Sequence, residues 1–232
     1  MASVTTRRAG TAGQAERSPA TRDPERTRRA ILDAATVEFA VNGFGGASVN
    51  AVAERAGINK RMLYHYFGNK EDLFLVVLEE AYADIRSCER LLSLTDLEPI
   101  EAMRRLVLFT WHYYLENPTF VSLLNTENLH KARHLRRSDN IRALHSPLVD
   151  TLGELLRRGA ADGVFRPGVD PVQLYISIAG LGYFYLSNAY TLSTIFDRDL
   201  KAQPALADRG EHIVEVILGY LRSTGRVGNE QD

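Results

Sequence analysis

The spacing of apolar residues most limits what this chain can fold into. From Asp23 onward they recur at three- and four-residue intervals, and no segment alternates convincingly as a strand does. Most interruptions contain proline or glycine, which end a helix or begin one. The sequence therefore predicts an all-α protein, with helices at about residues 24–42, 49–56, 60–66, 71 onward, 98–116, 118–131, 139–162, 171–195 and 205–224. Pro147 should kink or split the seventh of these helices.

Composition narrows the class of protein further. The chain has 232 residues, of which 45% are hydrophobic and 25% charged, so it is globular rather than wholly disordered. Its single cysteine, Cys88, excludes an internal disulfide and any CxxC metal or redox motif. Residues 1–22 lack the apolar stretch of a signal peptide and are predicted to form a disordered arm. A cytoplasmic protein is expected.

One segment is long and uncharged enough to suggest a membrane span. It runs from Pro171 to Phe196, but it contains seven Gln, Ser, Asn and Thr residues and is flanked by Asp170 and Asp197, where basic residues are expected. A helix buried all round, between its own domain and a second subunit, is the favoured interpretation. No membrane association is expected. The last helix, with Ile213, Val216, Ile217 and Tyr220 on one stripe, would share this subunit contact.

Charge is divided unequally along the chain. Met1 to Lys70 carries 11 Lys and Arg against 6 Asp and Glu, whereas the remainder carries 17 against 23. A basic head before an acidic body indicates that the head meets a polyanion, although part of the excess lies in the N-terminal arm.

The head has the pattern of a helix-turn-helix. Asp23, Ser48, Asn59 and Asn69 are each placed to cap a helix, and a turn of only Gly57-Ile58-Asn59 separates the second helix from the third. On the third helix Leu63 and Phe67 should face the core. Lys60, Arg61, Tyr64 and His65 should then lie on the opposite face.

This exposed face suits DNA. Arg61 can donate two hydrogen bonds to a guanine edge, while Lys60, Tyr64 and Lys70 suit phosphate oxygens. The residues expected to contact DNA are Ser48, Asn59, Lys60, Arg61, Met62, Tyr64, His65, Tyr66 and Lys70. Helix-turn-helix units also occur in proteins that never touch DNA, and a charged face is often merely solvated.

The residues of the head also distinguish it from helix-turn-helix units in general. In the segment 43–73, the residues Ser48, Val52-Ala53, Ala56-Gly57-Ile58, Asn59, Leu63-Tyr64, Phe67, Lys70-Glu71 and Leu73 are in register with a known pattern. The segment closely resembles the TetR family of bacterial transcriptional regulators. Arg61 departs from that family, where a small residue is frequent.

The resemblance implies a homodimer whose first three helices bind operator DNA and whose remaining helices form a ligand pocket and a dimer interface. The expected domains are 23–68 for DNA binding and 69–232 for effector binding and dimerisation. The function implied is a ligand-responsive regulator, expected to repress and to be released by a small molecule. An α-helical small-molecule-processing enzyme and a non-specific DNA-organising protein are the alternatives.

The sequence indicates the residues of the effector pocket less directly than those that contact DNA. Aromatic side chains and amides on apolar helices suggest an effector set of Trp111, Tyr113, Asn125, Asn128, Tyr183 and Asn188, because a buried amide needs a partner. The alternative is that each amide bonds to the neighbouring backbone. His130 and His134 have the i, i+4 spacing of metal ligands, but they lie in a basic run that favours a solvated connector. No metal, cofactor or catalytic residue is expected.

Overall fold

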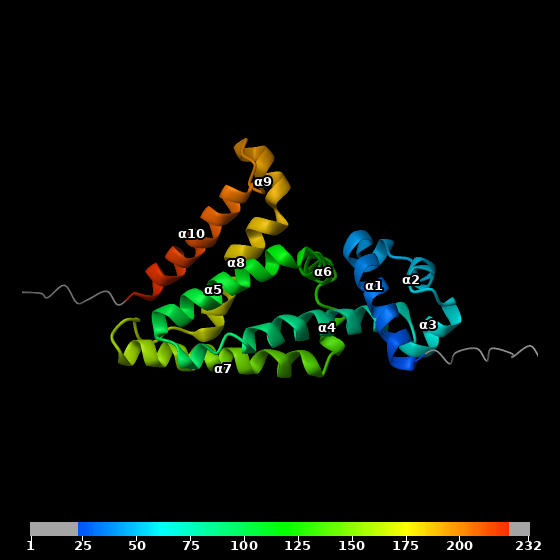
Figure 1. Ribbon diagram of the computed structural model, residues 1–232, viewed down its shortest axis with the longest axis horizontal. Coiled ribbons are helices and arrows are strands. Elements are labelled where there is room, and N and C mark those ends of the chain that lie inside the picture. The colour runs from blue at the N-terminus through cyan, green and yellow to red at the C-terminus, as the bar shows by residue number, and fades with distance from the viewer. Residues whose placement is uncertain (1–22, 223–232) are drawn as a thin grey trace, which may run out of the picture.

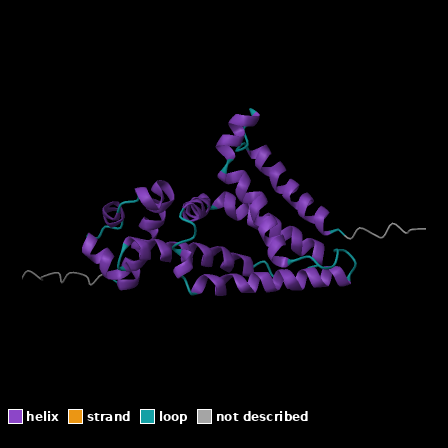
Figure 2. Cartoon of the chain, turned by 180° about the vertical axis from the view of Figure 1, so that it is seen from behind, coloured by secondary structure: helices purple, strands orange, loops and turns teal. Residues whose placement is uncertain are grey.

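The computed structural model describes residues 23–222, and this range forms an all-α protein, as predicted. Figures 1 and 2 show helices throughout, with a small head of three helices at one end of an elongated helical body. The elements are α1 (Pro24–Gly46), α2 (Val49–Arg55), α3 (Lys60–Phe67), α4 (Lys70–Arg90), η1 (Leu94–Asp96), α5 (Pro99–Glu116), α6 (Pro118–Leu129), η2 (Leu135–Arg137), α7 (Asn140–Ala161), α8 (Pro171–Ser187), α9 (Ala189–Phe196) and α10 (Gln203–Leu221). The predicted arm, residues 1–22, lies outside the described residues.

Local capping sets the helix starts in the head, and all four predicted caps are confirmed. The side chains of Asp23, Ser48, Asn59 and Asn69 each accept a hydrogen bond from a backbone N–H in the first turn of the helix that follows. Gly43 adopts φ 62° and interrupts α1 where the sequence predicts its end.

The predicted single helix over 171–195 is wrong, and the predicted split at Pro147 does not occur. The expected single helix over 171–195 is two helices that meet at Asn188, whose side-chain amide donates to the Phe184 carbonyl at 2.9 Å. That local bond offers the chain an alternative to helical continuation. Pro147 does not split α7, which runs unbroken past it. Pro147 and Ala143 are both exposed, so water can reach the carbonyl that loses its helical partner.

The head is built around one apolar core that extends into α4. Phe39 from α1 and Leu63 from α3 pack with Leu73, Phe74 and further residues of α4, all nearly inaccessible to solvent. The first half of α4 therefore belongs structurally to the head, although the sequence places a boundary before it. Because α4 continues to Arg90, one rigid helix joins the head to the body (Figure 1).

A second core fills the body between α5, α7, α8 and α10. Trp111 of α5 lies at its centre, 2% exposed, and packs against Gly210 of α10. Gly159 of α7 has no room for a side chain, since a Cβ there would lie 2.0 Å from the Phe165 ring. Glycine thus allows close packing of α10 on α5 at Gly210 and of the loop residue Phe165 on α7 at Gly159.

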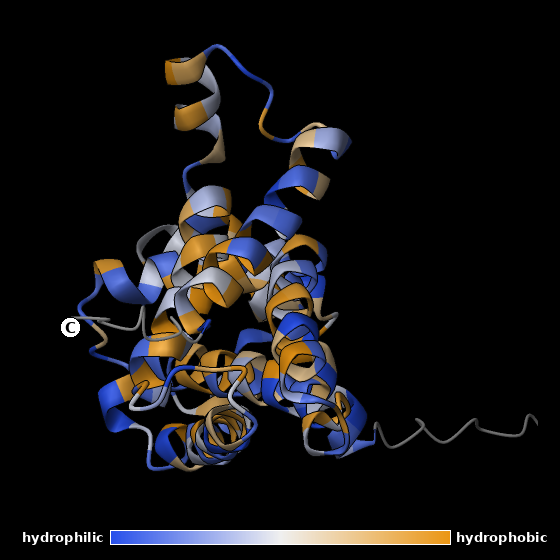
Figure 3. Cartoon of the chain, turned by 90° about the vertical axis from the view of Figure 1, so that its left-hand side faces the viewer, coloured by the Kyte–Doolittle hydropathy of each residue, from blue (hydrophilic) through white to orange (hydrophobic). Residues whose placement is uncertain are grey.

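The uncharged segment is not buried all round within one chain. On α8 the side chains of Val172, Ile176 and Phe184 are 45%, 54% and 59% exposed, and α10 exposes Val216 and Tyr220 beside them. Figure 3 shows apolar segments also on the helices rising at the top of the molecule, where α9 lies. Ile213 and Ile217, expected at a subunit contact, are instead buried in the body core. Among the described residues, no helix combines the length and apolarity needed to cross a membrane.

Candidate functional site

The third helix presents two opposite faces, as the sequence predicts. Leu63 and Phe67 are buried in the head, at 0% and 7% exposure, whereas Lys60, Arg61 and His65 are exposed on the other side. The Tyr64 ring is 40% exposed and lies 5.7 Å from the Lys60 ammonium. Two cations and two aromatic hydrogen-bonding groups therefore share the outer surface of one short helix.

The other expected DNA contacts lie around this face. The exposed residues Ser48 and Asn59 hold the amino ends of α2 and α3, with Asn59 Oδ1 accepting from the Met62 N–H at 2.8 Å. Met62 and Tyr66 are half-buried, so they contribute less surface than Arg61. The Lys70 ammonium lies 4.9 Å from the centre of the Phe44 ring. Contact of each residue with DNA remains a prediction.

A buried polar cluster joins the head to the body. Glu127 of α6 accepts from the His134 ring Nδ1–H at 2.6 Å and from the backbone N–H groups of His134 and Leu135 at 2.9 Å each. The His134 ring, 1% exposed, packs against Phe44 and Phe74 of the head at 4.6 and 4.9 Å. The solvated connector expected here is therefore wrong for His134, whose polar atoms satisfy a buried carboxylate.

Ion pairs extend this junction onto the start of α4. Arg133 Nη2 lies 2.9 Å from Glu71 Oε1, and Arg137 pairs with Asp72. Both carboxylates stand in the first turn of α4, directly after α3. These pairs are half-exposed, so each stabilises the junction by only about 0–1 kcal/mol.

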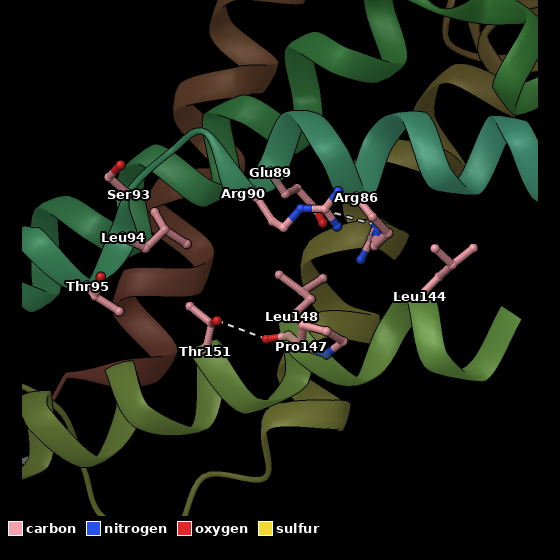
Figure 4. Close-up of a pocket in the computed structure, with 10 residues that line it drawn as sticks. All are labelled: Arg86, Glu89, Arg90, Ser93, Leu94, Thr95, Leu144, Pro147, Leu148 and Thr151. Atoms are coloured by element: carbon pink, nitrogen blue, oxygen red, sulfur yellow. Dashed lines mark hydrogen bonds and ion pairs between the residues drawn. The ribbon is translucent and has the colours of Figure 1, made fainter. Parts of the chain in front are cut away.

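A cavity of about 150 Å³ lies between α4, η1 and α7. Figure 4 shows the charged side chains of Arg86, Glu89 and Arg90 on α4 above Leu144 and Leu148 of α7. Arg86 and Glu89 are 2% and 5% exposed, and Arg86 Nη2 lies 3.0 Å from Glu89 Oε1. A charged pair is thus buried in the wall of a cavity that leucine side chains also line.

This pair leaves hydrogen-bonding capacity unused. Arg86 Nη2 also donates to the Tyr175 hydroxyl at 3.1 Å, but among the described residues Arg86 Nε and Nη1 have no partner. The Glu89 carboxylate contacts Arg86 without hydrogen-bond geometry at either oxygen. Burial raises the pKa of Glu89 to about 7, against the opposing effect of Arg86 and Arg90.

Two family descriptions match this chain. "Bacterial regulatory proteins, tetR family" covers residues 31–77, and "Tetracyclin repressor-like, C-terminal domain" covers residues 99–217. The HTH-type transcriptional repressor NicS of Pseudomonas putida is 42% identical over 85% of this chain and 93% of its own length. The chain belongs to the TetR family.

More distant matches also cover most of the chain. The HTH-type transcriptional regulator RutR of Escherichia coli is 25% identical over 84% of this chain and 90% of its own length. Among solved structures, the regulator SCO4942 of Streptomyces coelicolor has a TM-score of 0.64 at 22% identity, covering 84% of this chain and 98% of that one. AibR, solved with isovaleryl coenzyme A and operator DNA, has a TM-score of 0.62 at 21% identity, covering 82% and 97%.

Membership of the TetR family makes this protein a DNA-binding, ligand-responsive transcriptional regulator and not an enzyme. Of the alternatives weighed from the sequence, the enzyme is therefore rejected. The likeness to solved structures also supports the two-part architecture, a helix-turn-helix head followed by a helical body.

The six predicted effector residues of this TetR-family protein do not gather around one cavity. Trp111 is core, and the Tyr113 hydroxyl donates to Asp84 at 2.7 Å. The Tyr183 hydroxyl donates to Asn125. The amides of Asn128 and Asn188 donate to backbone carbonyls one turn earlier on their own helices, which is the alternative that the sequence left open. Their role in effector binding remains a prediction.

Sequence reasoning missed Arg86 and Glu89, although a signal for them exists. The buried stripe of α4 runs through Leu78, and steps of four and three residues from there reach Tyr82, Arg86 and Glu89. A charged pair that continues the apolar stripe of a helix must be buried with it, and buried charges require partners. A charged pair on the apolar stripe of a helix therefore indicates a candidate site from the sequence alone.

Proposed function

We propose that this TetR-family regulator is a homodimeric repressor that binds an inverted-repeat operator through α3 and releases it when a small molecule occupies the cavity beside α4. The observation that carries the DNA-binding half is the two-faced third helix. Leu63 and Phe67 anchor it in the head, which leaves Lys60, Arg61 and His65 free to enter a major groove. Such a regulator works in the cytoplasm, where its operator lies.

The exposed apolar face of α8 and α10 supports the homodimer. Ile176, Phe184, Val216 and Tyr220 are large, at least 40% exposed and located on neighbouring helices. A patch of this kind on a soluble chain marks an interaction surface. A second copy of the same face would bury it, and twofold symmetry would set two reading helices at the spacing of an inverted repeat.

The α4 helix supports release by a ligand. It contributes Leu73 and Phe74 to the head core and Arg86 to the cavity wall, so the two sites share one rigid element. A ligand that binds more tightly to the non-operator arrangement of the heads weakens DNA binding by that difference in affinity, typically ~1–3 kcal/mol.

Footprinting of the full chain on its own promoter DNA tests the proposal, and one protected site with inverted symmetry is expected. Arg61→Ala should cost about 1–3 kcal/mol on that site and much less on random duplex, because Arg61 is placed to read a base. Lys60→Ala is the matched comparison. Loss of one phosphate contact per half-site should weaken both duplexes and make the slope of log K against log salt shallower by about two units per dimer.

Three results would contradict the proposal. Uniform coverage of all DNA would identify a DNA-organising protein. A monomer by light scattering at micromolar concentration would exclude the homodimer. Equal loss on both duplexes for Arg61→Ala would show that Arg61 does not read sequence.

A further inference from the structure

The cavity beside α4 has a chemistry that selects its occupant. Its charged lining residues are Arg86, Arg90 and Glu89, so positive charge is in excess. On the opposite side, α7 contributes the apolar residues Leu144, Pro147 and Leu148 together with Thr151. A ligand that satisfies both walls has a small apolar body and an acceptor-rich polar end.

Arg86 is the anchor for this polar end, because some of its N–H groups lack a hydrogen-bond partner and are buried away from water. Its side chain is 2% exposed, and Nε and Nη1 donate to no described group. A buried donor without a partner costs free energy until an acceptor arrives. The guanidinium is also held in place from one side, since Tyr175 accepts from Nη2 and lies with its ring 5.3 Å away.

We propose that the effector is a small organic carboxylate of about one ring in size, whose carboxylate replaces Glu89 on the Arg86 guanidinium. This inference rests on the proposed function, because it names the ligand class of the same cavity. The planar guanidinium can meet a carboxylate with two parallel N–H···O bonds, which the Glu89 side chain does not achieve from its own helix. The volume of about 150 Å³ fits, since a cavity of that size can hold a benzene ring.

Glu89 can give way without leaving a buried negative charge. Its pKa is raised to about 7 by burial while Arg86 still partners it. A ligand carboxylate on Arg86 would repel the Glu89 carboxylate and favour its protonated form, which is neutral and can donate a hydrogen bond. The ligand carboxylate can therefore replace the Glu89 carboxylate as the negative charge beside Arg86.

Benzoate and benzamide are the probes, because they share a ring and differ in the charge of the polar end. Isothermal titration of the full chain should give millimolar or tighter binding of benzoate, and binding of benzamide at least about tenfold weaker. The double variant Arg86→Met, Glu89→Gln should lose at least about tenfold in benzoate affinity. It removes both charges together, which avoids stranding one buried ion.

The chain offers a matched control at identical spacing. Glu154 and Arg157 form an exposed i, i+3 pair on α7, with side-chain atoms 2.6 Å apart, so Glu154→Gln with Arg157→Met makes the same chemical changes outside the cavity. Benzoate affinity should not change in this control. Circular dichroism of both double variants reports whether each is folded.

Several results would overturn the proposal. They are equal binding of benzamide and benzoate, no benzoate binding at millimolar concentration, or an equal loss in the control variant. Operator release is measured separately by fluorescence anisotropy. Arg86-dependent benzoate binding that leaves operator affinity unchanged would keep the carboxylate site but refute its role as the effector site. Failure to bind any discrete operator would refute the proposed function alone.

Discussion

Removal of the Glu127 carboxylate should destabilise the protein more than any surface charge does. In Glu127→Ala, three donors lose their acceptor: the His134 ring N–H and the backbone N–H groups of His134 and Leu135. Glu127 and His134 are 3% and 1% exposed, so water cannot replace the lost bonds. Each stranded donor costs about 1–3 kcal/mol, but shared relaxation limits the total to about 3–5 kcal/mol, the usual cost of breaking a buried pair.

Denaturant unfolding at fixed protein concentration measures this loss. Fluorescence of the single tryptophan, Trp111, reports the body, and circular dichroism reports all helices. Glu127→Gln should cost less, because an amide oxygen can still accept from a backbone N–H. Glu101→Ala, on the exposed face of α5, should cost no more than about 0.5 kcal/mol. If Glu127→Ala matched Glu101→Ala, the buried cluster would not hold the junction together.

Three further predictions follow from burial. Burial raises the pKa of Glu89 from 4.5 to about 7, so the contribution of this group to the free energy of unfolding is fully present below pH 4.5. It should fall by about 3 kcal/mol as the pH rises through 7. Glu89→Gln should therefore flatten the dependence of the free energy of unfolding on pH. Ile176→Asp, at a 54% exposed position, should give a folded monomer by light scattering, whereas Ile100→Asp, 48% exposed on α5, should stay dimeric. Gly159→Ala should lower the thermal midpoint through a cost of about 1–3 kcal/mol or more, because its Cβ would meet the Phe165 ring at 2.0 Å; an unchanged midpoint would show that the ring moves freely.

The head was predictable from sequence because its signals are local. Each cap bonds to a backbone N–H two or three residues away, as Asn59 does to Met62, and a three-residue turn leaves the chain little choice of path. The outward face of α3 follows from the burial of Leu63 and Phe67 alone. Periodicity and capping therefore predict both the fold of the head and the surface it exposes.

The junction was not predictable, because its bonds join residues from different elements. Nothing near His134 in sequence indicates that α6 will set Glu127 beneath it, and a basic run predicts solvent instead. The break at Asn188 has a similar origin, since one side-chain bond to Phe184 outweighs a pattern that is apolar on both sides. Such features depend on which helices meet, and periodicity does not specify that.

The two regions that escaped prediction act on the same helix. Arg137 holds Asp72 at the start of α4, and Arg86 lies fourteen residues further along, about 21 Å away at the rise of an α-helix. Since the first half of α4 is packed into the head core, a ligand that binds Arg86 can affect α3 only by moving α4 as a unit or by loosening the Glu127 cluster. On either route, the loss of operator binding cannot exceed the ligand's difference in affinity between the operator-bound and the operator-free arrangement of the heads. A hundredfold loss therefore requires contacts at Arg86 that differ by about 3 kcal/mol between these two arrangements. Two charge-assisted hydrogen bonds, formed in one arrangement and absent in the other, supply a free energy of that size.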